Sequence, residues 1–449
     1  MRDHQNKWGN EMVVTSQDKF TETEKRLRGE IESKHGKTPE ELYEEREKRV
    51  RDTIALTEPD RVPVSLRMTY FPALYVGIPT SAAYYDPAAW RTALVKTLMD
   101  FEPDIFQCSS GTSPGPVMDV LGPTQTKWPG GPLPPDVSHQ AIDVETMKED
   151  EYDIYLSDPT GFALRYMLPR AFEALAPMAE LPPLADRALG FAGLTPIFTR
   201  ESFQKMARAL LEAGLEAEKW RQALGTVDID PINLGFVPNA HLGGAGGAPF
   251  DSISDFYRGM KGAMLDMFRH PDQLLTACDR ILQERIAKAV PANPNAPGNP
   301  KRLFLALHRG AEGFMSKTQF EKFYWPGLKA AMLRSIELGF VPMPFCEGAY
   351  GDRLEYFLEM PKGKVVCHFD LTDMAKAKEV LKDHVCIMGN VPSTLLQVGT
   401  PQDVDEYCRD LIKVCGKGGG FILTNGSSTD TAKPENVKAM INSTQKYSP

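Results

Sequence analysis

Short apolar runs recur through the last third of the chain, and a stretch with helical periodicity follows nearly every one of them. The five clearest runs occupy residues 302–309, 340–348, 364–370, 385–392 and 419–428. Strands that alternate with helices lie parallel in a sheet, because each helix carries the chain back to the edge where the next strand begins. The pattern therefore predicts an α/β fold built on parallel strands.

The hydrophobic pattern is weaker in the first half of the chain. Residues 18–56 are dense in Glu, Lys and Arg and have few apolar positions, which predicts exposed helices broken near Gly36. Thr38, followed by Pro-Glu-Glu, is a typical helix N-cap. A first strand is expected over residues 61–70, and weaker strand character follows at 103–106.

The middle of the chain predicts an elaboration of the fold. Residues 111–159 are rich in Pro and Gly without clear periodicity, which indicates a barrel insertion or a lid with extended hairpins. After an extended segment at 225–236, a glycine-rich run leads into a helix over 241–260. This run matches neither the dinucleotide fingerprint nor the P-loop. We therefore interpret it as an active-site loop, with Asp251 or Ser252 capping the helix.

Composition narrows the class of protein. The chain has 449 residues and 42% apolar content, enough for one enlarged barrel or two ordinary domains. The net charge of -9, without a basic cluster, argues against a nucleic-acid partner. No apolar run approaches the roughly 20 residues that span a bilayer, and the polar N-terminus lacks a secretory signal. Seven scattered cysteines form no disulfide framework, so we expect a cytoplasmic protein with free thiols and no membrane segment.

Polar residues gather where the predicted strands end. They are His308, Glu347, His368, Asp370, Asn390 and Asn425. In a (β/α)8 barrel the carboxyl ends of the strands meet at the mouth, where active sites lie. We therefore predict an α/β fold of the (β/α)8 (TIM) barrel type over residues 58–449, preceded by a helical N-terminal extension over residues 1–57.

Two of the strand-end residues suggest a metal site. Glu347 and His368 are 21 positions apart, at the ends of successive strands, and both residue types are ordinary zinc ligands. A hydrogen-bonded Glu–His pair in a polar cavity explains the same spacing. A third ligand is not evident; Cys346, His308 and Ser427 are candidates, although strand alternation points Cys346 into the wall.

The remaining strand-end residues have more general roles. Asp370 follows His368 by two positions and so faces the same side, where it could set the tautomer of the imidazole. His308 ends a strand and could orient the substrate. We expect both to act in catalysis, together with Glu347 and His368.

Five further residues are candidates for substrate binding. Arg67 and Tyr70 close the first strand, where they could clamp a carboxylate or a phenol, although Arg67 could equally form a structural ion pair. His241 lies in the glycine-rich run. Asn390 and Asn425 either contact the substrate or satisfy the backbone of the loops.

Several motifs occur in an order that resembles the uroporphyrinogen decarboxylase superfamily. They are PDRVPV at 59–64, FCEG at 345–348, CHFD at 367–370, IMGNVPSTLL at 387–396, GTPQDV at 399–404 and GKGGGFILTNGSSTDTAKPENVKAM at 416–440. The resemblance extends from about residue 45 to the C-terminus and is strongest after residue 300. It implies the barrel fold and one of two activities, decarboxylation or zinc-dependent methyl transfer with a corrinoid cofactor.

The motifs separate these two branches. The decarboxylases carry an Arg-Gln-Ala-Gly-Arg stretch that gathers substrate carboxylates, and here SLRMTYFPAL retains only Arg67. The thiol-dependent methyltransferases carry a His-x-Cys motif and a later Cys, where this chain has Phe345, Cys346 and Glu347, and Ser427. A thiolate-rich zinc site is therefore not expected.

What remains resembles the methyltransferase component of bacterial ether-cleaving O-demethylases. That resemblance implies zinc held by Glu347 and His368, a methoxylated aromatic substrate, and a corrinoid carried on a partner protein. It also implies a homo-oligomer. The alternatives are a decarboxylase of an acidic ring substrate and a non-catalytic binding protein on a degenerate barrel.

Overall fold

The computed structural model describes residues 21–108, 114–182, 193–225, 227, 229–239 and 243–447. Within these residues, eight parallel strands form the centre of the molecule. They are β1 (Ser65–Met68), β2 (Ile105–Cys108), β5 (Val237–Pro238), β6 (Lys301–Leu307), β7 (Phe340–Cys346), β8 (Val366–Phe369), β9 (Cys386–Val391) and β10 (Phe421–Asn425).

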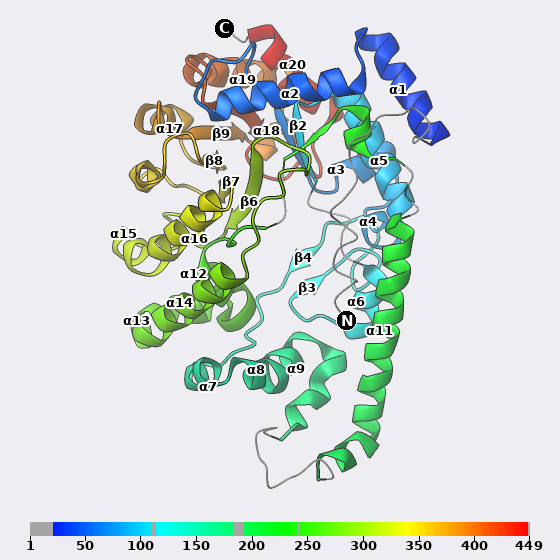
Figure 1. Cartoon of the computed structure of the whole chain (residues 1–449), viewed down its shortest axis with the longest axis vertical. Helices are drawn as coiled ribbons and strands as arrows, with labels where there is room; N and C mark the ends of the chain where they lie inside the picture. The colour runs from blue at the N-terminus through cyan, green and yellow to red at the C-terminus, as the bar shows by residue number, and fades with distance from the viewer. Residues whose placement is uncertain are drawn as a thin grey trace.

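The strands form two parallel sheets that meet side by side. One sheet has the order β1-β2-β5 and the other the order β10-β9-β8-β7-β6. A parallel bridge between Val64 and Leu423 joins β1 to β10, with the Leu423 amide donating to the Pro63 carbonyl at 2.9 Å. At the other junction Arg302 of β6 donates to the Pro238 carbonyl of β5 at 3.0 Å. The predicted (β/α)8 barrel with a helical N-terminal region is confirmed (Figure 1).

A helix or helical turn packs outside the strands after nearly every one of them. These elements are α3 (Phe71–Val76), α4 (Ala82–Tyr85), α5 (Pro87–Phe101), α12 (Pro249–Ser252), α13 (Gly259–Arg269), α14 (Pro271–Lys288), α15 (Lys317–Gln319), α16 (Trp325–Glu337), η8 (Leu354–Glu359), α17 (Met374–Leu381), α18 (Ser393–Val398), α19 (Pro401–Cys415) and α20 (Pro434–Tyr447). In α19 the buried residues include Val404, Cys408 and Leu411, so one face of the helix is apolar.

Alternation along each strand divides the core into two parts. Leu303, Leu305 and Leu307 of β6 belong to the outer core between the strands and the helices. Val341 and Met343 of β7 belong to the inner core, which fills the barrel with residues from six strands. Successive side chains of a strand point to opposite faces, so the inward positions of every strand are fixed once one of them is known.

The N-terminal helices α1 (Glu22–His35) and α2 (Pro39–Ile54) pack onto the barrel. Thr38 caps α2, its hydroxyl accepting from the Glu41 amide at 3.2 Å, and Gly36 ends α1 in the left-handed conformation. Val50 and Ile54 of α2 belong to the inner core of the barrel. Figure 1 shows α2 lying across the upper end of the strands in that view, so this helix closes the amino-terminal end.

A long insertion separates β2 from β5 and lies below the barrel in Figure 1. Its elements are α6 (Gly115–Leu121), β3 (Thr126–Lys127), β4 (Gln140–Ala141), α7 (Tyr152–Ser157), α8 (Pro159–Phe162), α9 (Leu168–Ala171) and α11 (Glu201–Gly225). The hairpin expected here is only a two-residue antiparallel pairing of β3 with β4, and helices make up most of the segment. Within the described ranges, no helix combines the length and the apolar character that crossing a membrane requires.

Candidate active site

Four inward-facing side chains meet inside the barrel mouth. The guanidinium carbon of Arg67 on β1 lies 4.2 Å from the ring centroid of Phe345 on β7 and 5.8 Å from that of Phe304 on β6. The Phe345 ring in turn lies 4.7 Å from the imidazole of His368 on β8. Because β1 and β7 lie on opposite sides of the strand ring, Arg67 reaches across the barrel interior.

His368 is held as a neutral imidazole. Its Nε2 lies 3.1 Å from the Asn425 carbonyl oxygen, and a carbonyl can only accept, so Nε2 carries the proton. Burial, with the charge of Arg67 as a smaller cause, lowers the pKa of His368 to about 3. Its Nδ1 therefore has a lone pair, and this buried atom has no partner among the described residues.

The role predicted for Asp370 beside His368 is wrong in this structure. Asp370 was expected to orient the imidazole, but the Asn425 carbonyl takes that position. The Asp370 carboxylate instead accepts from the Gly348 amide at 3.1 Å. Burial raises the pKa of Asp370, and the Glu347 carboxylate adds to the shift. A hollow of about 550 Å³ opens beside Asp370.

Within the described part of the chain, Arg67 is a cation without a paired anion. Burial lowers its pKa, opposed by the charges of Glu347, Asp370 and Asp430. Among the described residues its guanidinium makes no hydrogen bond or ion pair, and its Nε is buried. The structural ion pair that the sequence left open for Arg67 is therefore absent from the described part of the chain.

The residue types at the mouth suit zinc, but within the described part of the chain Glu347 and His368 do not form a group of three potential ligand atoms within 4.8 Å of one another. Zinc binds unprotonated imidazole nitrogens, and the unpartnered Nδ1 of His368 is such a nitrogen. Glu347 offers an exposed carboxylate just past β7. Cys346, a candidate third ligand, lies in the outer core, and burial raises the pKa of its thiol well above the usual value. The zinc site at Glu347 and His368 stays a prediction.

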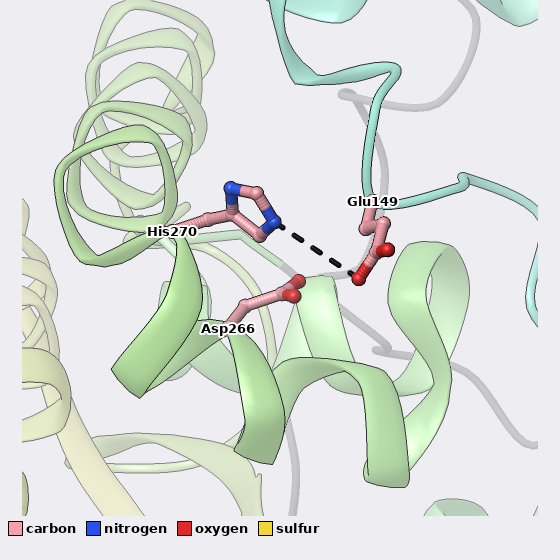
Figure 2. A group of neighbouring side chains, drawn as sticks. All are labelled: Glu149, Asp266 and His270. Atoms are coloured by element: carbon pink, nitrogen blue, oxygen red, sulfur yellow. Dashed lines mark ion pairs between the residues drawn. The ribbon is translucent and has the colours of Figure 1, made fainter.

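Another group of metal-ligand residue types occurs away from the strand ends. Glu149, Asp266 and His270 bring potential ligand atoms within 4.8 Å of one another (Figure 2). Asp266 is already occupied, however, because Arg258 Nε and the Tyr152 hydroxyl donate to it at 2.6 and 2.7 Å. His270 and the exposed Glu149 are 4.0 Å apart. These contacts indicate an ion-pair network that fastens the insertion to α13.

His308 is supported by two aspartates that sequence reasoning did not assign to the site. Its Nδ1 lies 2.6 Å from Asp255, and this hydrogen bond raises the pKa of His308. Asp251 accepts from the His308 and Arg309 amides at 3.1 and 3.0 Å and from the Tyr324 hydroxyl at 2.7 Å. Burial raises the pKa of Asp251 to about 6. Asp251 and Asp255 are four residues apart and so lie on one helical face, and this spacing could have indicated from the sequence that they act together.

The predicted helix cap at Asp251 or Ser252 is wrong. Both residues lie inside α12, whose N-cap Ala248 has no side-chain hydrogen bond. The preceding residues Gly243, Gly244, Ala245 and Gly246 line a hollow of about 820 Å³ between the insertion and α14.

Comparison with known proteins supports the resemblance over the second half of the chain. Residues 235–447 match the family model of Uroporphyrinogen decarboxylase (URO-D). A methyltransferase from Methanosarcina mazei has a similar solved structure, with a TM-score of 0.53 and 16% sequence identity, covering 90% of this chain and 98% of that chain. At this identity the likeness concerns the fold. No curated protein shows a significant sequence match.

The URO-D match covers the strand-end residues after residue 235, whereas Arg67 and Tyr70 precede it. Tyr70 is fully buried, and its hydroxyl bonds the Tyr84 hydroxyl and His139 Nδ1 at 2.8 and 2.9 Å. A substrate contact by Tyr70 stays a prediction. His241 lies outside the described residues.

The two asparagines predicted to bind substrate, Asn390 and Asn425, bond the backbone, which is one of the alternatives the sequence left open. Asn390 Nδ2 donates to the Asp370 and Thr372 carbonyls at 3.0 and 2.8 Å. Asn425 accepts from the Arg67 amide and donates to its carbonyl, both at 3.0 Å, and so joins β10 to β1.

Proposed function

We propose that the protein is a methyltransferase that takes a methyl group from a methoxylated aromatic compound and passes it to the corrinoid of a partner protein. The observation that carries the proposal is His368, a buried neutral imidazole that packs against Phe345 and whose Nδ1 has no partner among the described residues. The URO-D match and the fold of the similar methyltransferase support it.

Cleavage of the methyl–oxygen bond of an aryl ether is slow because a free phenolate is a poor leaving group. Zinc on Glu347 and His368 would act as a Lewis acid toward the ether oxygen. The methyl carbon leaves without the electron pair of its bond to oxygen, and the corrinoid supplies the pair that forms the new bond. The oxygen then takes a proton, which His308 Nε2 is suited to give because Asp255 favours the charged imidazolium.

The aromatic residues position the substrate. Phe304 and Phe345 stack with ring centroids 6.1 Å apart, and together they offer an apolar surface to an aromatic ring. Holding the ring here fixes the methyl carbon relative to the mouth, and orientation of this kind supplies a large part of many rate enhancements.

A decarboxylase acting on an acidic ring substrate is the alternative. Such a substrate carries several carboxylates and needs several free cations. The mouth offers Arg67, whereas Arg302 is paired with Glu47 and Arg309 with Asp255. This arrangement favours a substrate with one anionic group at most.

The test is transfer in a defined mixture. We expect the purified protein, a reduced corrinoid carrier and a panel of methoxybenzoates and methoxyphenols to give methylated corrinoid, followed by absorbance. His368→Ala should abolish transfer. His384→Ala should not, because His384 bonds the Met360 carbonyl and precedes β9 at the other end of the barrel. No transfer across the panel, with carbon dioxide released from an acidic tetrapyrrole, would reverse the assignment.

A further inference from the structure

Three polar side chains stand in a row on the inner face of adjacent strands. Arg67 of β1 pairs in register with Gln107 of β2. Asn239 directly follows β5, and its amide donates to the Phe106 carbonyl at 2.8 Å, so it lies next to Gln107. Ile105 and Val237 belong to the inner core, and positions two residues further along a strand face the same side. All three polar side chains, which we call the polar row, therefore point into the barrel.

The polar row is buried and lacks partners. Asn239 is 1% exposed and Gln107 is 7% exposed. Neither Nδ2 nor Oδ1 of Asn239 has a hydrogen-bond partner within the described ranges, nor has Oε1 of Gln107 or Nε of Arg67. Buried polar groups are nearly always paired, so a cluster of orphaned atoms calls for a specific explanation.

The side-chain amide nitrogens of three other buried asparagines have partners. Asn436 donates to the Leu396 and Gly399 carbonyls at 2.9 and 3.0 Å, and Asn390 and Asn425 have partners as described above. In the part of the chain that the structure describes, single unsatisfied buried atoms also occur elsewhere, among them Asn436 Oδ1 and the Tyr350 hydroxyl, but the polar row brings such atoms together on adjacent strands. Nearby acids do not relieve this deficit, because Asp370 accepts from the Gly348 amide and Asp430 from the Tyr70 amide, and neither pairs with Arg67.

We infer that the polar row recognises a carboxylate group of the aromatic substrate. The inference rests on the proposed function in taking that substrate to be the methyl donor. A guanidinium and two primary amides offer N–H donors from three adjacent strands, which suits the planar oxygens of a carboxylate. Arg67 also lies over Phe345, so an acid bound to the row places its ring against the aromatic surface. The substrate class is then the methoxylated aromatic carboxylic acids.

Calorimetry with a matched ligand pair tests the charge. We expect the purified protein to bind 4-methoxybenzoate at least tenfold more tightly than 4-methoxybenzamide, which has the same shape without the charge. Asn239→Asp places a like charge against the ligand and should reverse this preference. Equal binding of the two ligands by the unchanged protein would overturn the inference, and this comparison needs no variant to fold.

A stability measurement separates ligand binding from a structural role. Asn239→Leu removes two unsatisfied polar atoms, so we expect the melting temperature to rise while the affinity for 4-methoxybenzoate falls by about tenfold or more. Asn436→Leu is the control, because it removes the hydrogen bonds that Asn436 Nδ2 donates and should lower the melting temperature without changing affinity. A fall in melting temperature for Asn239→Leu with unchanged affinity would show that the row is structural.

The two proposals can fail separately. Binding of the acid through the polar row without methyl transfer would leave the recognition site intact and remove the proposed reaction. Efficient transfer from neutral ethers, with no binding of acids and no effect of Asn239→Asp, would keep the reaction and remove the recognition site.

Discussion

Replacing Glu47 by Gln should destabilise the whole barrel. Glu47 lies on α2 and makes two hydrogen bonds to Arg302 of β6, each 2.9 Å long. The Glu47 side chain is 2% exposed and that of Arg302 is 0% exposed. The Asn299 amide also donates to Glu47, at 3.1 Å. The substitution leaves the Arg302 charge buried without its counterion.

The expected cost follows from this burial. Removing one partner of a buried ion pair costs about 3–5 kcal/mol, because the remaining charge is neither solvated nor neutralised. Gln keeps one acceptor oxygen, so we expect a loss of about 3 kcal/mol for Glu47→Gln and more for Glu47→Ala. Replacing both residues, by Glu47→Leu with Arg302→Met, should recover much of the loss.

Urea unfolding followed by both fluorescence and circular dichroism measures the effect. Glu45→Gln is the matched control, since Glu45 is on the same helix and pairs with Lys37, with 44% and 46% of the side chains exposed. Exposed pairs contribute about 0–1 kcal/mol, so this variant should resemble the parent protein. If Glu47→Gln and Glu45→Gln unfold alike, α2 is not coupled to the barrel and the reasoning is wrong.

Three further predictions concern the site and the dependence on pH. His368→Ala and Glu347→Ala should each lose zinc by elemental analysis and lose activity, with a native-like melting transition; full metal content in both variants would refute the site. Burial alone would raise the pKa of Asp104, but its two arginine partners outweigh burial and lower it. Its stabilising contribution is therefore present above the unfolded pKa of about 4 and lost as the pH falls through the lower folded pKa, so Asp104→Asn should flatten the acid limb of a stability–pH curve. Asp255 raises the pKa of His308, so Asp255→Asn should move the alkaline loss of activity to lower pH; an unmoved profile would exclude His308 as the proton donor.

The strands in the second half of the barrel could be predicted from the sequence. The run at 302–309 corresponds to β6 (Lys301–Leu307), and that at 340–348 to β7 (Phe340–Cys346). These strands are four to seven residues long and bounded by helices. β7 and β8 are buried along their whole length and β6 is mostly buried, so the apolar runs stand out.

The strands in the first half could not be predicted as well, because they are short. β5 has only two residues, Val237–Pro238, and it follows the extended segment expected at 225–236 without overlapping it. A period of two cannot be recognised in a pair of residues, so nothing in the sequence marked Gln107 or Asn239 as inward-facing.

The candidate site also has features that could be predicted from the sequence and features that could not. Alternation correctly placed Cys346 in the wall and His368 inside, because these directions depend on neighbouring residues alone. The partner of His368 could not be predicted, since the Asn425 carbonyl lies 57 residues away and is supplied by the closure of the barrel.

Val50 and Ile54 of α2 belong to the inner core at the amino-terminal end of the barrel, so we expect substrate to enter from the opposite end, the mouth. Substrate that enters from the mouth must leave by the mouth, after the methyl group has gone. In the proposed reaction the corrinoid carrier approaches that same face, so a docked carrier blocks the departing phenol. Turnover would then be ordered: the aromatic compound enters first, the carrier arrives, and the carrier departs before the phenol is released. If the barrel has a single entrance, the phenol product should inhibit competitively with respect to the ether substrate. It should not inhibit competitively with respect to the corrinoid carrier.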